Sequence, residues 1–293
     1  MVGLILLDKP EGMTSFGAAA ALRRLTGEKR VGHTGTLDPM ATGLLPILLG
    51  QATRLVSLLM ETEKEYEAVL RLGMRTDTLD VTGRILETRP AAGRAELEAV
   101  LPRFTGEILQ TPPMYSALKK DGVRLYELAR QGKEVERKPR PVTIRELELL
   151  EACGPDTYRL RVVCSKGTYI RTLCDDIGRE LGCGGVMAAL RRTATGGFSI
   201  REAVTLEQLE ADGPAAHLLP ADRAVAGYPA LQVSAAQAGR FLNGGQLDFA
   251  RLSLQNPAHG ALYRVYGPGN RFLGMGRADG DKEQLAVQCI IQI

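Results

Sequence analysis

The run from Gly32 to Gly43 places several reactive side chains inside a glycine framework (Gly-His-Thr-Gly-Thr-Leu-Asp-Pro-Met-Ala-Thr-Gly). Pro39 biases the residue before it toward an extended backbone, so the carboxylate of Asp38 should project from a loop rather than from a helix. The glycines permit close approach of a ligand to the backbone. The Gly-Lys-Ser/Thr and Gly-x-Gly-x-x-Gly patterns of phosphate-binding loops are absent from the run. The composition therefore fits either an ordinary Asp-Pro turn or a reactive loop built around one carboxylate.

Arg171 is a candidate partner for such a carboxylate. The segment Cys164–Arg171 predicts a strand that runs into a helix, and Arg171 follows the helix start on a different face from the apolar stripe. In an ordinary helix it would form an exposed ion pair with Asp175, worth only about 0.2–0.5 kcal/mol. In a reactive site it would pair with a carboxylate such as Asp38, orient it, and lower its pKa by about 1–3.

Tyr66 is a third candidate, because it is the polar-tipped member of an apolar strand face. Residues 64–73 alternate with period two, which predicts a strand with Tyr66 on its apolar side. Most tyrosines in such positions are core residues with a satisfied hydroxyl group, whereas in a pocket the ring would offer a stacking surface for a base. Periodicity alone does not choose between these roles.

The elements that must position these residues follow from periodicity and turn signals. Ser15 is expected to cap a helix that runs from Phe16 to about Leu25 and ends at Gly27. The Ala/Pro/Gly-rich segment 211–229 predicts a linker, and the β-rich runs after it predict a small β-barrel-like module of about 65 residues. The predicted strands are 3–7, 64–73, 142–150, 157–164, 261–266, 271–275 and 285–293, and the predicted helices are 16–25, 52–60, 93–104, 170–181 and 186–190.

The net charge of the chain is concentrated in one segment. The chain has 293 residues with 37 Lys and Arg against 34 Asp and Glu, a net +3. Residues 119–140 hold eight basic and four acidic residues, a net +4, which leaves 29 basic and 30 acidic residues, a net −1, elsewhere. Such a run is most often a solvated surface hairpin or helix. It is also suited to contact phosphates, because local clusters of Lys and Arg release counterions from nucleic acids.

Composition excludes several classes of protein. With 44% hydrophobic and 24% charged residues, the chain is not disordered, collagen-like or a coiled coil. No apolar stretch approaches the ~20 residues that a membrane span needs, and the N-terminus lacks the basic region of a signal peptide. The five cysteines contain no Cys-x-x-Cys pair, so we expect free thiols in a reducing cytoplasm and neither a disulfide framework nor a zinc site.

Several motifs, in this order, resemble the tRNA pseudouridine-55 synthase family. The reactive loop, continued to Leu45, is similar to the family signature, and the resemblance is close over residues 3–193 and looser beyond about 228. The other matching motifs are Leu7-Asp8-Lys9-Pro10-x-Gly12-x-Thr14-Ser15, Lys64-x-Tyr66, Arg75-Thr76-Asp77-Thr78-x-Asp80-x-x-Gly83, Gln110-x-Pro112-Pro113-x-Tyr115-Ser116-Ala117-Leu118-Lys119, Ser165 to Arg171, and Leu190-Arg191-Arg192.

The resemblance implies an α+β catalytic domain over 1–225, with a mixed, mainly antiparallel central sheet and the active site in its central cleft. It also implies a small C-terminal β-barrel-like RNA-binding (PUA-like) domain over 228–293. An insertion at about 119–141 would close over the RNA, with Lys119, Lys120 and Arg124 as its contacts. This turns the charged segment into a specific hypothesis about nucleic-acid binding.

The resemblance also implies the chemistry, a cofactor-free and metal-free isomerisation of one uridine in the TΨC arm of tRNA. Asp38 matches the nucleophile, which attacks either the ribose C1′ or the uracil C6. Tyr66 matches the tyrosine that stacks on the base, and Arg171 matches the arginine that pairs with the aspartate. The remaining matches are substrate-binding positions, namely His33, which helps to hold the extruded nucleotide, and the pocket-lining Tyr169 and Leu190.

The resemblance implies an enzyme that acts on the T-arm stem-loop as a cytoplasmic monomer, without a membrane and without an obligate protein partner. One alternative is a guide-RNA-dependent pseudouridine synthase, which shares the catalytic motifs. The complete insertion and the lack of long basic extensions favour the stand-alone bacterial type. A second alternative is a non-catalytic tRNA-binding or tRNA-folding protein, and the presence of Asp38, Tyr66 and Arg171 argues against it.

Overall fold

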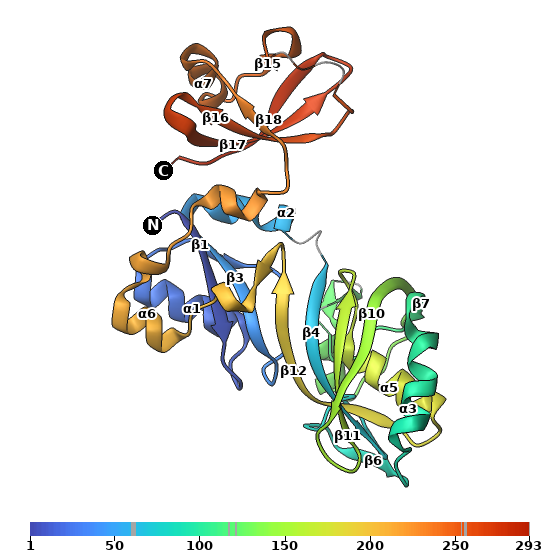
Figure 1. The fold of residues 1–293 in the computed structure, drawn as a ribbon. Coiled ribbons are helices and arrows are strands. Elements are labelled where there is room, and N and C mark those ends of the chain that lie inside the picture. The colour runs from blue at the N-terminus through green and yellow to red at the C-terminus, as the bar shows by residue number, and fades with distance from the viewer. Residues whose placement is uncertain (60–62, 117, 121, 253, 255–256, 293) are drawn as a thin grey trace. The chain divides into compact units, whose positions relative to one another are not determined.

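The computed structural model describes residues 1–293 except 60–62, 117, 121, 253, 255–256 and 293. Helices and strands are mixed along the chain, as expected of an α+β protein (Figure 1). Contacts divide the chain into two compact units. The first contains Met1–Pro39, Leu45–Glu61 and Arg201–Ile293, and the second contains Met40–Leu44 and Thr62–Ile200.

The second unit is built on a sheet with the strand order β12–β4–β11–β10–β7, in which every neighbouring pair is antiparallel. The start of β3 (Thr42–Leu49) adds a parallel pairing, because Thr42 and Gly43 lie opposite Arg191 and Arg192. The sheet is therefore mixed and mainly antiparallel, which confirms the expected fold class. The five strands are β4 (Lys64–Leu72), β7 (Gly106–Gln110), β10 (Arg140–Ala152), β11 (Thr157–Cys164) and β12 (Gly185–Thr195).

Strand β4 alternates as the sequence predicts. Every second side chain from Tyr66 to Leu72 is buried, whereas those between them are partly or fully exposed. The buried side is covered in part by α5 (Ile170–Glu180), which packs against β4 and β12. A Cβ atom at Gly178 would lie only 2.0 Å from the backbone nitrogen of Gly185, so this helix approaches the start of β12 as closely as a glycine permits.

The predicted helix over 186–190 is wrong, because these residues belong to strand β12. Leu190 lies opposite Ala68 of β4, and Arg192 lies opposite Tyr66. A short apolar run does not distinguish a buried strand from a buried helix by periodicity alone. Pairing with β4 on one side and with β3 on the other decides the outcome here.

The smaller elements of the second unit surround this sheet. The predicted helix over 93–104 is divided into an α-helical turn and a 3-10 turn, because Pro102 lacks the amide hydrogen that would continue the helix. The charged segment forms a short hairpin followed by one helix. The elements are β5 (Met74–Thr76), β6 (Ile85–Thr88), α3 (Arg94–Val100), η2 (Leu101–Phe104), β8 (Lys119–Lys120), β9 (Val123–Arg124), α4 (Leu125–Arg130) and β13 (Phe198–Ser199).

The N-terminal part of the first unit is a small apolar core around β1 (Gly3–Lys9), α1 (Ser15–Thr26) and the end of β3, which pairs with β2 (Val31–His33). Helix α1 ends at Gly27 as predicted, but its N-cap is Thr14, whose side chain accepts a hydrogen bond from the amide of Gly17. The prediction that Ser15 is the cap is wrong, because its hydroxyl group is bonded elsewhere. The chain continues through η1 (Gly50–Leu55) and α2 (Val56–Leu59).

The C-terminal part of the first unit contains a separate five-stranded sheet with the order β14–β16–β17–β18–β15. Its three long strands coincide with the three predicted β-rich runs, and they enclose an apolar core with Phe241 and Leu285 at 0% exposure. The elements are η3 (Ile200–Glu202), α6 (Leu206–Asp212), η4 (Pro214–His217), η5 (Ala221–Val225), β14 (Ala230–Gln232), α7 (Ala235–Leu242), β15 (Leu247–Asp248), η6 (Phe249–Arg251), β16 (Leu262–Gly267), η7 (Pro268–Asn270), β17 (Arg271–Asp279) and β18 (Gln284–Ile290). None of the helices in the described residues is long and apolar enough to cross a membrane.

Candidate active site

The loop that carries Asp38 is fixed by hydrogen bonds on both sides of that residue. The hydroxyl group of Ser15, at the start of α1, donates to the carbonyl oxygen of Leu37 at 3.1 Å and accepts from its amide at 2.8 Å. The carbonyl oxygen of Pro39 accepts from the amide of Gly12 at 2.8 Å. Because both neighbours of Asp38 are held in this way, the partly buried carboxylate has a defined starting position.

Lys9 supports the same loop from the end of β1. Its side chain has 0% exposure, and Nζ donates to the carbonyl oxygens of Pro10 at 2.7 Å, Met13 at 2.6 Å and Pro39 at 3.3 Å. The buried ammonium thereby connects the turn after β1 to the residue that follows Asp38. Sequence reasoning included Lys9 in a family motif and gave it no role. The signal was a lysine at the end of a strand that is apolar except for Asp8.

His33 ends β2, five residues before Asp38 in the same loop. It is partly buried, and its Nε2 atom lies 3.5 Å from Thr36 Oγ1. His33 pairs with Ile47 of β3 in the antiparallel register, so the sheet holds its backbone. The loop that carries Asp38 begins directly after it. His33 and Asp38 thus both belong to the first unit, on one loop.

Tyr66 and Leu190 belong to the second unit and project from neighbouring strands on the same face. Tyr66 lies opposite Arg192, and Leu190 precedes Arg192 by two residues, so all three side chains share one side of the sheet. Tyr66 is 6% exposed and Leu190 is 8% exposed. The structure therefore brings these two predicted pocket residues together.

Arg171 lies in the first turn of α5 with 6% exposure, and its guanidinium group is held by several partners in the second unit. Nη1 donates to the carbonyl oxygen of Thr78 at 3.2 Å, and Nη2 donates to that of Tyr115 at 2.7 Å. Nη1 also lies 3.7 Å from Asp80 Oδ2. The proposed i,i+4 partner, Asp175, forms its ion pairs with Arg179 at 2.7 Å and with Arg75 at 3.6 Å.

Asp80 is a buried carboxylate beside Arg171 that sequence reasoning did not single out. It is 5% exposed, and its Oδ1 atom accepts hydrogen bonds from Thr78 Oγ1 at 2.8 Å, the Thr82 amide at 3.0 Å and Thr82 Oγ1 at 2.6 Å. The other carboxylate oxygen faces Arg171. The Thr-x-Asp-x-Thr spacing was the available signal, because short hydroxyl side chains two residues away readily satisfy a carboxylate.

Tyr169 is the N-cap residue of α5, two positions before Arg171. Gln110, at the end of β7 and 1% exposed, forms two hydrogen bonds with its backbone. Gln110 Oε1 accepts from the Tyr169 amide at 3.0 Å, and Gln110 Nε2 donates to the Tyr169 carbonyl oxygen at 3.3 Å. The buried glutamine therefore fixes the turn from which both Tyr169 and Arg171 project.

The basic residues of the charged segment lie on its hairpin. Lys119 and Lys120 in β8 and Arg124 in β9 are exposed, and Lys119 pairs with Arg124 in the antiparallel register. The guanidinium carbon of Arg124 lies 5.8 Å from the centre of the Tyr126 ring, and its Nη1 atom lies 3.2 Å from the tyrosine hydroxyl group. The hairpin therefore presents three cations to solvent, beside the partly buried Tyr126 of α4.

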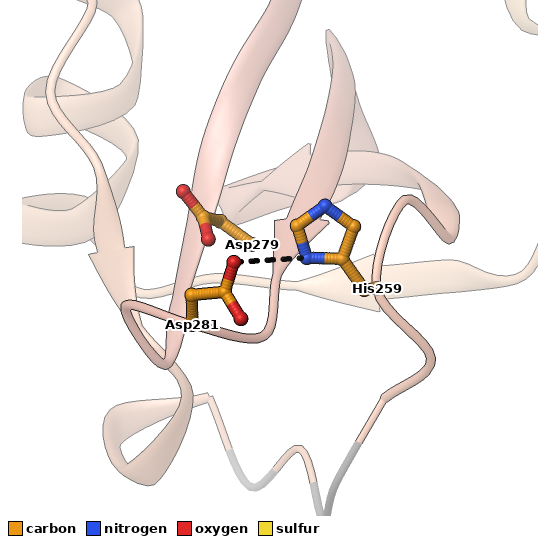
Figure 2. A group of neighbouring side chains, drawn as sticks. All are labelled: His259, Asp279 and Asp281. Atoms are coloured by element: carbon orange, nitrogen blue, oxygen red, sulfur yellow. Dashed lines mark ion pairs between the residues drawn. The ribbon is translucent and has the colours of Figure 1, made fainter.

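One group of described residues has the composition of a metal site. The ligand atoms of His259, Asp279 and Asp281 all lie within 4.8 Å of one another (Figure 2). Within the group, His259 Nδ1 accepts a hydrogen bond from the amide of Gly280 at 3.3 Å, and Lys282 Nζ lies 3.3 Å from Asp279 Oδ2. His259 Nδ1 also lies 4.0 Å from Asp281 Oδ2, so these side chains take part in a surface network of charges.

Two of the buried cysteines, Cys164 and Cys174, are unsuited to nucleophilic chemistry at neutral pH. Burial raises the pKa of the Cys164 thiol to about 11 and that of Cys174 to about 12, so both remain protonated. A carboxylate needs no such activation, because it is ionised at neutral pH. Asp38 is therefore a better candidate nucleophile than either of these buried thiols.

This mixed sheet, with a loop-borne aspartate and a helix-borne arginine, is the fold of a pseudouridylate synthase. The family model described as TruB family pseudouridylate synthase (N terminal domain) matches residues 23–170. Models for the tRNA pseudouridylate synthase B C-terminal domain and for the C-terminal region of pseudouridine synthase II TruB match residues 171–226 and 229–288. The chain belongs to the TruB family of pseudouridine synthases, which confirms the resemblance.

Curated relatives are similar in sequence to this chain over nearly its whole length. A tRNA pseudouridine synthase B of Burkholderia mallei is 48% identical over 281 residues, covering 94% of this chain and 93% of the relative. One of Aromatoleum aromaticum is 50% identical over 283 residues, covering 95% and 89%. Among solved structures, a chain from a Cbf5-Nop10-Gar1 complex matches 99% of this chain and 84% of its own, with a TM-score of 0.75 and 27% identity. The expected α+β catalytic fold with a PUA-like C-terminal domain is therefore confirmed.

Proposed function

We propose that this protein isomerises a uridine at position 55, in the TΨC loop of tRNA, to pseudouridine. The observation that supports the proposal most strongly is the presence of an intact Asp38 loop in a chain 48–50% identical to relatives named tRNA pseudouridine synthase B. The hydrogen bonds of Ser15, Lys9 and Gly12 to this loop suit a group that must meet its target in a fixed geometry.

In the proposed reaction, Asp38 attacks either the ribose C1′ or the uracil C6 of the target nucleotide. The N1–C1′ bond breaks, the base turns over, and a C5–C1′ bond forms while the proton on C5 is lost and N1 gains one. Substrate and product are isomers, so no oxidant, reductant or group donor is consumed.

The other site residues have proposed roles in the same scheme. Arg171 would pair with the Asp38 carboxylate, keep it ionised and orient it. Asp80 faces Arg171 at 3.7 Å and therefore limits how strongly that guanidinium binds a second carboxylate. Asp80 is then a positioning residue that acts through Arg171.

The target base must leave the loop stack before it can react, at a cost of a few kcal/mol. Tyr66 would offset this cost by stacking on the extruded base, and Tyr169 and Leu190 would line its pocket. His33 would help to hold the rearranged loop of the RNA. Lys119, Lys120 and Arg124 would contact backbone phosphates of the T arm, because an exposed cationic hairpin binds RNA by counterion release.

We further propose a cytoplasmic monomer that needs no protein partner. The guide-RNA-dependent alternative remains relevant because two similar structures are Cbf5-containing complexes. The discriminating experiment incubates the purified chain with an unmodified tRNA transcript and no guide RNA, then maps pseudouridine at single-nucleotide resolution. Product at position 55 supports the proposal, and a transcript with cytidine at that position serves as the control. If the transcript is still unmodified at the end of the reaction, the proposed function is overturned.

A further inference from the structure

Arg192 is a buried cation whose charge is not balanced within the second unit. Its side chain has 0% exposure, and only Nε has a hydrogen-bond partner among the described residues, the Leu44 carbonyl oxygen at 2.7 Å. Both terminal nitrogens, Nη1 and Nη2, are buried without a hydrogen-bond acceptor in that part of the chain. An unpaired buried ion is costly enough that a native structure rarely keeps one without a use.

Lys64 adds a second positive charge next to the first. It begins β4, is partly buried, and has no carboxylate partner among the described residues. Burial lowers the pKa of the Lys64 ammonium, and the nearby charges of Arg192 and Lys166 lower it further. The adjacent carboxylate of Glu65 does not help, because Glu65 projects to the opposite face and pairs with Arg161 at 2.7 Å.

Both cations are neighbours of Tyr66 on the same face of the sheet. Arg192 is directly opposite Tyr66 in the antiparallel pair, where Cα atoms are about 5 Å apart. Lys64 precedes Tyr66 by two residues on the same face, which places their Cα atoms about 7 Å apart. The aromatic ring proposed to stack on the target base therefore lies next to two positive charges that have no carboxylate partner among the described residues.

We propose that Lys64 and Arg192 form a subsite for one backbone phosphate of the substrate RNA, next to the nucleotide whose base stacks on Tyr66. The inference rests on the proposed function, which supplies the RNA. Each nucleotide brings a phosphate along with its base, and lysine and arginine are the side chains that bind this group. Lys64, which is partly exposed, contacts the phosphate, and Arg192 contributes its charge from the buried side.

A thermodynamic cycle between protein and RNA tests the subsite. A set of T-arm stem-loops is prepared, each with one uncharged methylphosphonate near the target uridine. A matched stem-loop has an ordinary phosphate at the same position. We expect one methylphosphonate next to the target to weaken binding to the wild-type protein about 10-fold, and to have little further effect on Lys64→Gln. Lys64→Gln should also reduce the slope of log Kd against log salt by about 0.7–0.9.

The matched control is Arg159→Gln, which removes a cation from the other face of the same sheet. Arg159 pairs with Glu67 at 3.3 Å and Glu151 at 3.0 Å, so its loss should leave the methylphosphonate effect unchanged. Lys64→Arg, which keeps the charge, should retain the wild-type slope. Because Lys64→Gln removes a cation that is repelled by its neighbours, its thermal unfolding midpoint should be equal to or above that of the wild type.

The subsite is overturned if the effects of Lys64→Gln and of each methylphosphonate on the binding free energy simply add. A wild-type scan in which no single methylphosphonate near the target weakens binding would also overturn it, and this result does not depend on any variant folding. Failure of the wild-type protein to bind or modify the T arm is a different result, because it would refute the proposed function.

Discussion

Ser15→Ala tests whether the rigidity of the Asp38 loop matters for catalysis. The serine is 3% exposed, and its hydroxyl group forms two hydrogen bonds with the backbone of Leu37, at 3.1 and 2.8 Å. Alanine fits the space but leaves a buried amide and a buried carbonyl group without these partners. The unmet amide alone is worth about 1–3 kcal/mol, and the loop can avoid this cost only by moving.

The loss falls on the residue directly before the proposed nucleophile. A free-energy change of about 1–3 kcal/mol corresponds to a factor of roughly 5–150 in the population of the correctly placed loop. A displacement of about 1 Å is enough to lower a rate about 100-fold. We therefore expect kcat to fall about 10- to 100-fold, with the Kd for tRNA within about twofold of the wild type, because binding energy comes from the RNA contacts.

The assay is single-turnover release of tritium from 5-tritiated uridine in tRNA, measured at saturating enzyme, with Kd from filter binding. Thr14→Ala is the matched control, because it removes the N-cap hydrogen bond to Gly17 from the adjacent position and costs about 1 kcal/mol. This variant loses a comparable amount of stability without altering the bonds to Leu37. If both variants turn over equally fast, the Ser15 bonds serve only to stabilise the fold, and our reasoning about the loop is refuted.

The remaining predictions concern the proposed nucleophile, the hairpin and one partly buried acid. Asp38→Ala should abolish tritium release and leave tRNA binding largely intact, and wild-type turnover by this variant would refute the assignment. Reversing the charges of Lys119, Lys120 and Arg124 should weaken tRNA binding and flatten its salt dependence, whereas an unchanged slope would count against the hairpin as a contact. Burial raises the pKa of Asp176 from 3.8 to about 6, so this carboxyl group favours the folded state below pH 3.8, and its contribution is lost as the pH rises through about 6. Asp176→Asn should therefore raise the thermal unfolding midpoint at pH 7.5 and lose that advantage near pH 4, as calorimetry at the two pH values would show.

The sequence predicted features that depend on local patterns. The buried face of β4, including Tyr66, followed from the period-two alternation, and the start of α5 before Arg171 followed from helical spacing and the turn before it. Prediction failed where a distant partner decided the outcome. Leu190 was assigned to a helix, and pairing of β12 with β4 makes it part of a strand.

The contacts of Arg171 and Ser15 show the same limit. Arg171 meets Asp80 across 91 positions of the chain, and Ser15 reaches Leu37 across 22. No local rule relates residues so far apart, and the sequence alone did not show which carboxylate would be the partner of Arg171. Ser15 satisfied the composition rule for an N-cap as well as Thr14 did, and the buried backbone of Leu37 determined which hydroxyl group capped the helix.

The backbone from residue 37 to residue 44 is held at both of its ends, which gives a structural role to Lys9 and Arg192, two residues to which the sequence analysis assigned none. Upstream, Ser15 and Lys9 hold the residues on either side of Asp38. Downstream, Arg192 Nε donates to the Leu44 carbonyl oxygen at 2.7 Å, and a Cβ atom on Gly43 would lie 2.4 Å from the Arg192 carbonyl oxygen. Only glycine fits at that position, which has a φ of 100°. We infer that the bonds to Leu37, Pro39 and Leu44 place the proposed nucleophile before the substrate binds, because a group that must attack one carbon atom of a flexible RNA loop gains rate from a fixed starting position.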